Sequence, residues 1–157
     1  DGPIDIVFNV VSDYYFRSKF IVGQLDNDLQ NHKIFQYGSI HRCILGKKNE
    51  DTIFVTHNYA FDQNRITFVE TDKGNGVSVV WSLQAISKEK TRIGIANFIK
   101  PNFIKVGLFN LFMKNKTAKG MAESWRILNE YCEKLATENI SHPNSIVLPE
   151  KVTQLAQ

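Results

Sequence analysis

"KTAKGMAESWRILNEYCEKLATE", residues 116–138, decides the fold, because it predicts one long amphipathic helix. Apolar residues recur in it at intervals of three or four and form a single stripe: Ala118, Met121, Trp125, Leu128, Cys132 and Leu135. Charged side chains occupy the opposite face. A helix with such a stripe buries it against another element, and we expect that element to be the concave face of a sheet.

Upstream of the helix the hydrophobic period changes to two, which is typical of strands. β-branched and aromatic residues alternate with polar ones in five segments: residues 39–45, 52–60, 65–71, 76–86 and 91–99. The connections between them are short and turn-like, so neighbouring strands are expected to pair antiparallel as a meander. The clearest hairpin signal is Asn75-Gly76, a pair that suits a type I′ turn.

Two short helices are predicted before the strands. "DGPIDIVFNVVSDY", residues 1–14, carries apolar residues at helical spacing after Pro3, and a second short helix is expected over residues 14–20. Residues 1–138 are therefore expected to form one α+β domain. Residues 139–157 contain two prolines and little periodicity, which predicts a C-terminal tail that is laid on the surface or partly disordered.

The composition is typical of a folded globular protein and argues against several classes. Hydrophobic residues make up 43% and charged residues 22% of the chain, and the net charge is +3 with lysine and arginine scattered. A nucleic-acid surface typically shows a basic stripe, so no nucleic-acid partner is expected. No apolar run approaches the roughly 18 residues that a membrane span needs. Cys43 and Cys132 lie far apart and suggest reduced thiols, which points to the cytoplasm.

The order of these elements resembles the SRPBCC superfamily, which includes START lipid-transfer domains, birch-pollen-allergen-like proteins and polyketide cyclase-like proteins. Its members often show a proline, an apolar pair and then an aspartate after the first strand, where this chain has Pro3, Val7, Phe8 and Asp13. "VGQLDN" (22–27) and "YGSIHRCIL" (37–45) are similar to the next two strands. The resemblance covers residues 1–137. It departs in one respect, because this chain begins at the helix. We expect that the preceding strand was removed or left out, or that the tail around "SIVLPEKV" (145–152) takes its place.

The resemblance implies a helix-grip fold, in which a curved antiparallel sheet wraps around the long C-terminal helix. It also implies a cavity between sheet and helix that holds a lipid, sterol or polyketide-like molecule. Strand alternation and the helix stripe select the residues expected to line it: His41, Cys43, Val55, His57, Tyr59, Trp81, Leu83, Ile95, Asn97, Phe109, Met113, Met121, Trp125 and Leu128, with Val79 and Ile93 on the same faces.

The histidine and cysteine two residues apart in "YGSIHRCIL" leave three interpretations open. A metal site needs three or four converging ligands, which His41, Cys43 and His57 supply only if adjacent strands bring them level. A nucleophilic pair needs the Cys43 thiolate close to an imidazole. We favour cavity lining, in which His41 and His57 hydrogen-bond a ligand headgroup and Cys43 acts as a small hydrophobe. No cofactor is expected.

The leading functional interpretation is a module that carries or senses a hydrophobic small molecule. An enzyme resembling the polyketide cyclases would instead use His41, His57 and Tyr59 as general acid or base. A protein-interaction module would expose an apolar patch near "NFIKVGLFNLFM", residues 102–113. The sequence leaves a homodimer open.

Three further polar residues carry no functional argument in the sequence. Glu70 is expected in solvent at a strand end, and Asp13 is expected to cap a helix or form a turn. His142 is expected in a loop.

Overall fold

The computed structural model describes residues 1–14, 16–22, 24–29, 39–45, 50–74, 76–98, 114–148 and 152. Two short helices come first, α1 (Ile4–Ser12) and α2 (Arg17–Phe20). The strands that follow are β1 (Gln24–Leu29), β2 (Ser39–Leu45), β3 (Glu50–Asp62), β4 (Arg65–Asp72), β5 (Ser78–Ser87) and β6 (Lys90–Phe98). The long helix α4 (Lys114–Glu138) comes last. The expected α+β order is confirmed.

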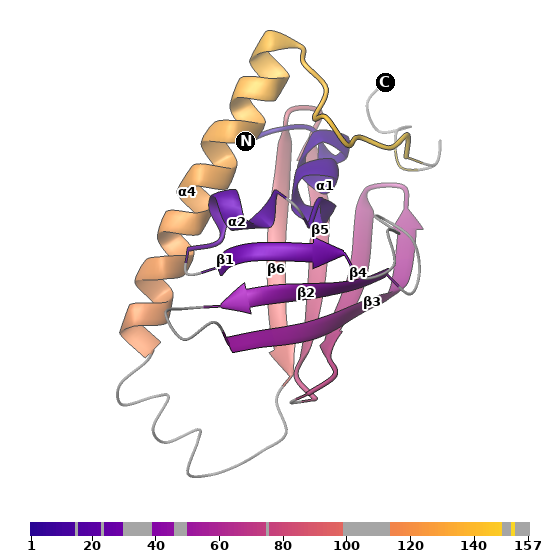
Figure 1. The fold of residues 1–157 in the computed structure, drawn as a ribbon. Coiled ribbons are helices and arrows are strands. Elements are labelled where there is room, and N and C mark those ends of the chain that lie inside the picture. Colours follow the sequence, from indigo (N-terminus) through magenta and orange to yellow (C-terminus); the bar gives the residue numbers. More distant parts are fainter. Residues whose placement is uncertain are drawn as a thin grey trace.

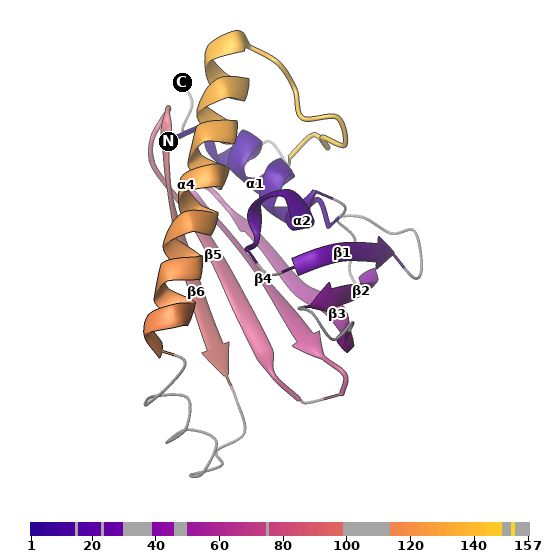
Figure 2. The ribbon, with the colours of Figure 1, turned by 60° about the vertical axis from the view of Figure 1, so that its left-hand side comes forward.

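The strands form one antiparallel sheet in the order β1-β2-β3-β4-β5-β6, so each strand pairs with its neighbour in the sequence. This arrangement confirms the predicted meander. The sheet twists strongly, because β1 to β3 cross the direction of β4 to β6 (Figure 1). The three helices lie on one side of it (Figure 2), and we call that side the inner face.

The centre of the inner face is built from β4 and β5. Burial alternates along β4, where Ile66 and Phe68 are fully buried and the residues beside them are partly exposed. Ile66 pairs with Leu83 and Phe68 with Trp81. Directly paired residues of antiparallel strands share a face. The rings of Phe68 and Trp81 accordingly stack, with their centroids 5.7 Å apart.

A bulge in β3 changes which residues face inward. The pairing register shifts between His57 and Ala60, so Asn58 and Tyr59 together occupy the space of one residue. Asn58 has a φ of 54°, in the left-handed region that asparagine tolerates better than most residues. Thr56 is fully buried before the bulge, and Tyr59, the second residue of the bulge, packs against the core. The two therefore share the inner face although they are three residues apart.

The predicted face of β3 is wrong on the N-terminal side of this bulge. Val55 and His57 alternate with the buried Thr56 and so lie on the outer face, while Tyr59 faces inward. The Nε2 atom of His57 lies 2.9 Å from the hydroxyl of Thr71, which is also on the outer side. The prediction assumed an unbroken period of two, and one extra residue inverts the assignment.

Helix α1 is buried almost all round. Phe8, Val10 and Val11 are fully buried, and the Phe8 ring meets those of Phe61 and Phe68 edge-on at 5.6 and 6.2 Å. A helix that is apolar on every side needs neighbours on every side. The sheet, α4 and the C-terminal residues supply them, which offsets the weak helix propensity of its β-branched residues.

The C-terminal half of α4 is seated on this core, and the predicted stripe is correct there. Leu128, Cys132 and Leu135 are buried. Trp125 is half-buried and meets the Trp81 ring edge-on at 6.4 Å. Met121, one turn earlier, is 37% exposed, so the stripe becomes less covered toward the start of the helix.

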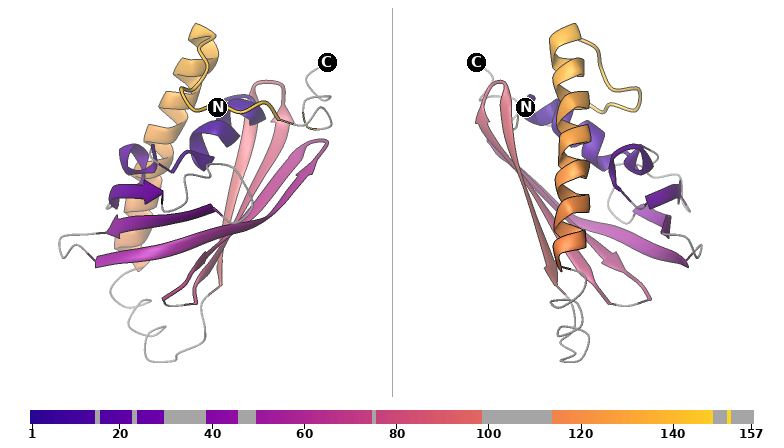
Figure 3. Two further views of the ribbon diagram at one scale, coloured as in Figure 1. Left: turned by 45° about the vertical axis from the view of Figure 1, so that its right-hand side comes forward. Right: turned by 90° about the vertical axis from the view of Figure 1, so that its left-hand side faces the viewer.

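Residues 139–148, which we call the strap, fold back from the end of α4 and cross beside α1 (Figure 3). The amide of Asn9 donates to the carbonyl of Ile146 at 3.2 Å, and the Ile146 N–H donates to Asn9 Oδ1 at 2.8 Å. His142 and Leu148 are buried. The strap is therefore laid over the surface of α1 and is fixed there by these hydrogen bonds and by its two buried side chains.

Replacing Asn58 tests the bulge. Asn58→Val should lower the free energy of unfolding by about 1–2 kcal/mol, because a β-branched residue is strained at positive φ. Asn58→Gly, the matched control, should stay within about 0.5 kcal/mol of the parent. Urea denaturation of both variants measures the difference. Equal stability of the two variants would contradict the bulge.

Candidate functional site

A cavity of about 290 Å³ lies between α4 and β6, beside the start of α1. Its walls are mainly apolar and come from three elements: Val7 of α1, Ile93 of β6, and Trp125, Leu128 and Cys132 of α4. Asp1, Gly2, Thr91 and Asn129 complete the lining. Apolar walls with a few polar groups are the usual composition of small-molecule sites. We refer to this space as the cavity.

Only part of the predicted lining reaches the cavity. Trp125 and Leu128 line it, as does Ile93 on the same face. Trp81 and Leu83 lie on the inner face as predicted, but they are buried within the core. Ile95 packs at the edge of that core.

Other predicted residues lie away from the cavity or outside the described part of the chain. Asn97 is exposed, and Met121 is not among the lining residues of the cavity. Phe109 and Met113 lie outside the residues that the structure describes.

The strand register separates the predicted histidines. Position 41 pairs with Phe54, and position 43 pairs with Thr52. Phe54 and Thr56 alternate with His57, so His41 and His57 are at register positions of opposite faces. Among the described residues, no group of three histidine, cysteine or acidic side chains could hold a metal ion. The condition that the metal interpretation requires, level ligands on adjacent strands, is therefore not met.

A buried ion pair lies at the centre of the inner face. Arg17, the first residue of α2, donates from Nη1 to Glu70 Oε2 at 2.8 Å, and its Nη2 lies 2.6 Å from Glu70 Oε1. Both side chains are only 4% exposed. The Nε of Arg17 donates to the carbonyl of Val11 at 3.0 Å, and the indole of Trp81 donates to Glu70 at 3.1 Å. Every one of these bonds compensates a charge that has lost its water.

Aromatic rings and hydroxyls extend this ion pair into a network. The Arg17 guanidinium lies over the rings of Tyr14 and Trp81, 4.5 and 4.9 Å from their centroids. Tyr14 hydrogen-bonds Thr56, and its hydroxyl lies 3.4 Å from that of Tyr59. We call these six residues, Tyr14, Arg17, Thr56, Tyr59, Glu70 and Trp81, the Arg17–Glu70 network.

The two tyrosines of the network act as hydrogen-bonding groups at neutral pH. Burial, assisted by the charge of Glu70, raises the pKa of Tyr59 to about 12. Burial first and Glu70 second also raise the pKa of Tyr14 well above its ordinary value. Both phenols therefore keep their protons, so Tyr59 is poorly suited to act as a general base.

The alternation along β4 predicts that Glu70 faces inward, but a carboxylate is usually exposed to solvent. Glu70 continues the alternation of Ile66 and Phe68 along β4 and is 3% exposed, so the expectation that it lies in solvent is wrong. Its partner Arg17 lies 53 residues earlier in the chain. Periodicity places Glu70 inward but cannot name the cation that makes this burial tolerable.

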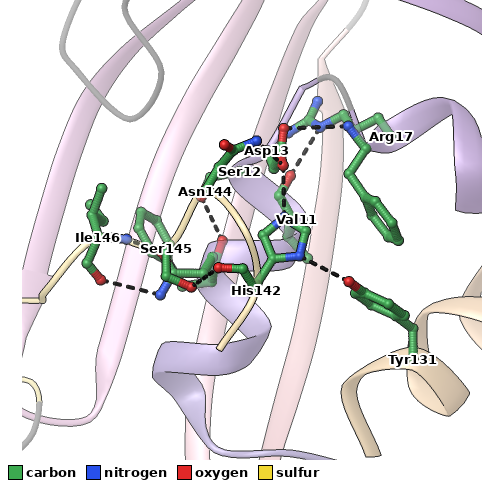
Figure 4. Close-up of polar contacts among 12 residues, drawn as sticks. Val11, Ser12, Asp13, Arg17, Tyr131, His142, Asn144, Ser145 and Ile146 are labelled. Carbon is green, nitrogen blue, oxygen red and sulfur yellow. Dashed lines mark hydrogen bonds and ion pairs between the residues drawn. The ribbon is translucent and has the colours of Figure 1, made fainter. Parts of the chain in front are cut away.

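A second buried polar cluster joins the strap to the body of the domain (Figure 4). His142 Nε2 donates to Asp13 Oδ2 at 2.7 Å, and Asn144 donates to the same oxygen at 2.9 Å. The other ring nitrogen of His142, Nδ1, lies 3.2 Å from the hydroxyl of Tyr131 on α4. Phe16 stacks on Tyr131 and meets His142 edge-on. Asp13 and His142 are 3% and 2% exposed in their side chains.

This cluster holds a charged carboxylate in the interior. Burial alone raises the pKa of Asp13, but hydrogen bonds from His142 and Asn144 and the charge of His142 outweigh burial, so the pKa lies below its ordinary value. The imidazole is bonded on both nitrogens and is 4% exposed as a residue. These two hydrogen bonds of His142, to Asp13 after α1 and to Tyr131 of α4, fix the strap against both helices. No local pattern in the sequence pairs residues 129 positions apart.

Removing the Asp13 charge should make stability depend differently on pH. Because the folded pKa is lowered, Asp13 stabilises the fold above its unfolded pKa of about 3.9, and this contribution is lost as the pH falls through the folded value. Asp13→Asn should cost about 1.5–3 kcal/mol at pH 7, the range for hydrogen bonds to charged groups, and progressively less below about pH 4. Denaturation at several pH values measures this, with the exposed Asp62→Asn as control. A cost independent of pH would contradict the charged Asp13.

The sequence matches no protein-family model and has no significant match among curated proteins. Within the described residues, no helix is long and apolar enough to cross a membrane. The function is therefore argued from the geometry of the cavity and the groups around it.

Proposed function

We propose that the chain has a helix-grip fold and binds a hydrophobic small molecule in the cavity between α4 and β6. The observation that carries this proposal is the cavity itself, about 290 Å³ with walls of valine, isoleucine, tryptophan, leucine and cysteine. Its volume is near the lower end of the roughly 300–1,000 Å³ typical of ligand sites. The antiparallel sheet, with the long C-terminal helix on its inner face, also supports the helix-grip assignment.

The groups at the cavity favour an uncharged apolar ligand. Burial raises the pKa of Cys132 to about 12, so its side chain remains a neutral thiol and behaves as a small hydrophobe. Thr91 donates to the carbonyl of Gly2 at 2.9 Å, which leaves its oxygen able to accept a hydrogen bond from a ligand. Asn129, the other neutral polar group, hydrogen-bonds Glu133.

The enzyme alternative has less support in this geometry. Among the described residues that line the cavity there is no histidine, and the acidic Asp1 lies 3.6 Å from Lys90. His57 is on the outer face, and Tyr59 belongs to the Arg17–Glu70 network. General acid–base catalysis needs a titrating group within hydrogen-bond reach of the substrate. Binding without chemistry therefore suits this lining better, as in a carrier or a sensor.

Filling the cavity tests the proposal. Ile93→Phe should weaken binding of the uncharged fluorescent probe N-phenyl-1-naphthylamine at least about tenfold, because the larger ring takes up the space of the probe. The free energy of unfolding should change by less than about 2 kcal/mol, since the ring enters an existing hollow. A fluorescence titration gives the affinity, and thermal unfolding verifies the fold.

Arg92→Phe is the matched control, because it adds the same ring to the neighbouring position on the outer side of β6. It should bind the probe like the parent protein. Equal binding by Ile93→Phe and the parent would contradict a ligand site in this cavity, as would a parent protein that does not bind the probe.

A further inference from the structure

A second and larger hollow lies between α1, the end of α4 and the strap. This groove has a volume of about 1180 Å³ and is also bordered by Lys88 and Glu89 at the turn between β5 and β6. The groove and the cavity share Asp1 and Gly2 in their linings. Trp125 and Leu128 line the cavity and are not among the described residues that line the groove. The proposed ligand site does not account for it.

The strap presents apolar side chains to this groove. Ile140 is 50% exposed, Ile146 is 36% exposed and Val147 is 96% exposed. Ile6 of α1 continues this surface. Exposed single hydrophobes are common, but a cluster along a hollow marks an interaction site.

The anchoring of the strap explains why these side chains point outward. His142 and Asn144 turn inward to Asp13, and the backbone of Ile146 is bonded on both sides to Asn9. These bonds use the polar groups of the strap and fix its backbone. The apolar groups of Ile140, Ile146 and Val147 are thus held on a rigid segment, which lowers the entropic cost of binding a partner.

The border of the groove is acidic in a chain that is basic overall. Among the described lining residues, the four carboxylates of Asp1, Asp5, Glu89 and Glu133 exceed two cations, Lys88 and the α-ammonium group of Asp1, which lies 3.4 Å from Glu133 Oε1. The net charge of the chain, in contrast, is +3. Lys90 lies 3.6 Å from Asp1. Local excess of carboxylates beside an apolar strip selects a partner with the opposite charge.

We propose that this groove is a docking site for a basic amphipathic peptide segment of a partner protein. The apolar side chains of that segment would pack on Ile6, Ile140, Ile146 and Val147. Its lysine or arginine side chains would pair with Asp5 and Glu89. This mode combines an apolar anchor with a charged border, as in other helix-in-groove complexes.

Fluorescence anisotropy with a defined peptide tests this proposal on the whole chain. The probe is a short fluorescein-labelled peptide of leucine and lysine with leucine on one helical face. Two control peptides are a version with glutamate in place of lysine and a scrambled version without an apolar face. The lysine peptide should bind most tightly, and its affinity should fall as salt is added.

Two variants separate the apolar from the charged contribution. Val147→Asp should weaken the lysine peptide at least about tenfold, and the double variant D5K/E89K should weaken it about fivefold or more. The matched controls are Val22→Asp, at a residue 53% exposed outside the groove, and the exposed Asp62→Lys. Both controls should bind like the parent.

Three results would overturn the proposal. The first is unchanged affinity of Val147→Asp, and the second is equal binding of the glutamate or scrambled peptide. The third is a concentration-dependent dimer in size-exclusion chromatography that Val147→Asp abolishes, because a second copy would then occupy the groove.

Discussion

The arrangement of helices over the sheet depends on the ion pair between Arg17 and Glu70. Both charges are almost completely removed from water, which by itself is costly for each ion. The carboxylate is compensated by the guanidinium and by the indole N–H of Trp81, and the guanidinium also bonds the Val11 carbonyl at the end of α1. One side-chain pair therefore links α1, α2, β4 and β5. Any other placement of α2 would leave a buried charge unpaired.

With α2 fixed in this way, α1 is enclosed between the sheet, α4 and the strap. The strap covers the third side of α1, and its hydrogen bonds with Asn9 and Asp13 hold it there. The cavity and the groove then both lie beside α1. The cavity is lined by apolar side chains from α1, β6 and α4, and the groove is bordered by α1 and the strap.

The two proposed sites differ in the chemistry they offer. The cavity offers mainly apolar walls, with the polar groups of Asp1, Thr91 and Asn129 among them, which suits a small uncharged molecule. The groove is four times as large and combines apolar side chains with carboxylates, which suits a segment of a protein. Helix α1 contributes to both sites, with Val7 lining the cavity and Ile6 lining the groove.

The fold could be predicted from the sequence because its signals are local. Alternation and short turns predict the order of β2 to β6, and the stripe through Leu128, Cys132 and Leu135 predicts the seated part of α4. The segment of β1 is expected only from the family resemblance. The parts that could not be predicted depend on a change of register or on distant partners. One extra residue at Asn58 inverted the faces of Val55 and His57.

The candidate site was predicted less completely for the same reason. Helical spacing predicts Trp125 and Leu128, but the cavity is also lined by Val7 and Cys132, which no strand pattern brings together. Glu70 followed the inward alternation of β4, yet a carboxylate at such a position is interpretable only with Arg17 in view. Asp13 and His142 are joined across most of the chain, so the sequence around either residue does not reveal the contact.

The most direct test of the central role of Arg17 and Glu70 is a double-mutant cycle in urea denaturation. Glu70→Leu alone should cost about 3–5 kcal/mol, because it leaves a buried guanidinium without its carboxylate. The double variant Arg17→Met, Glu70→Leu should cost less than the sum of the two single changes, with a coupling of about 1–3 kcal/mol. Additive single effects would contradict the account, because they would mean that the two charges do not depend on each other.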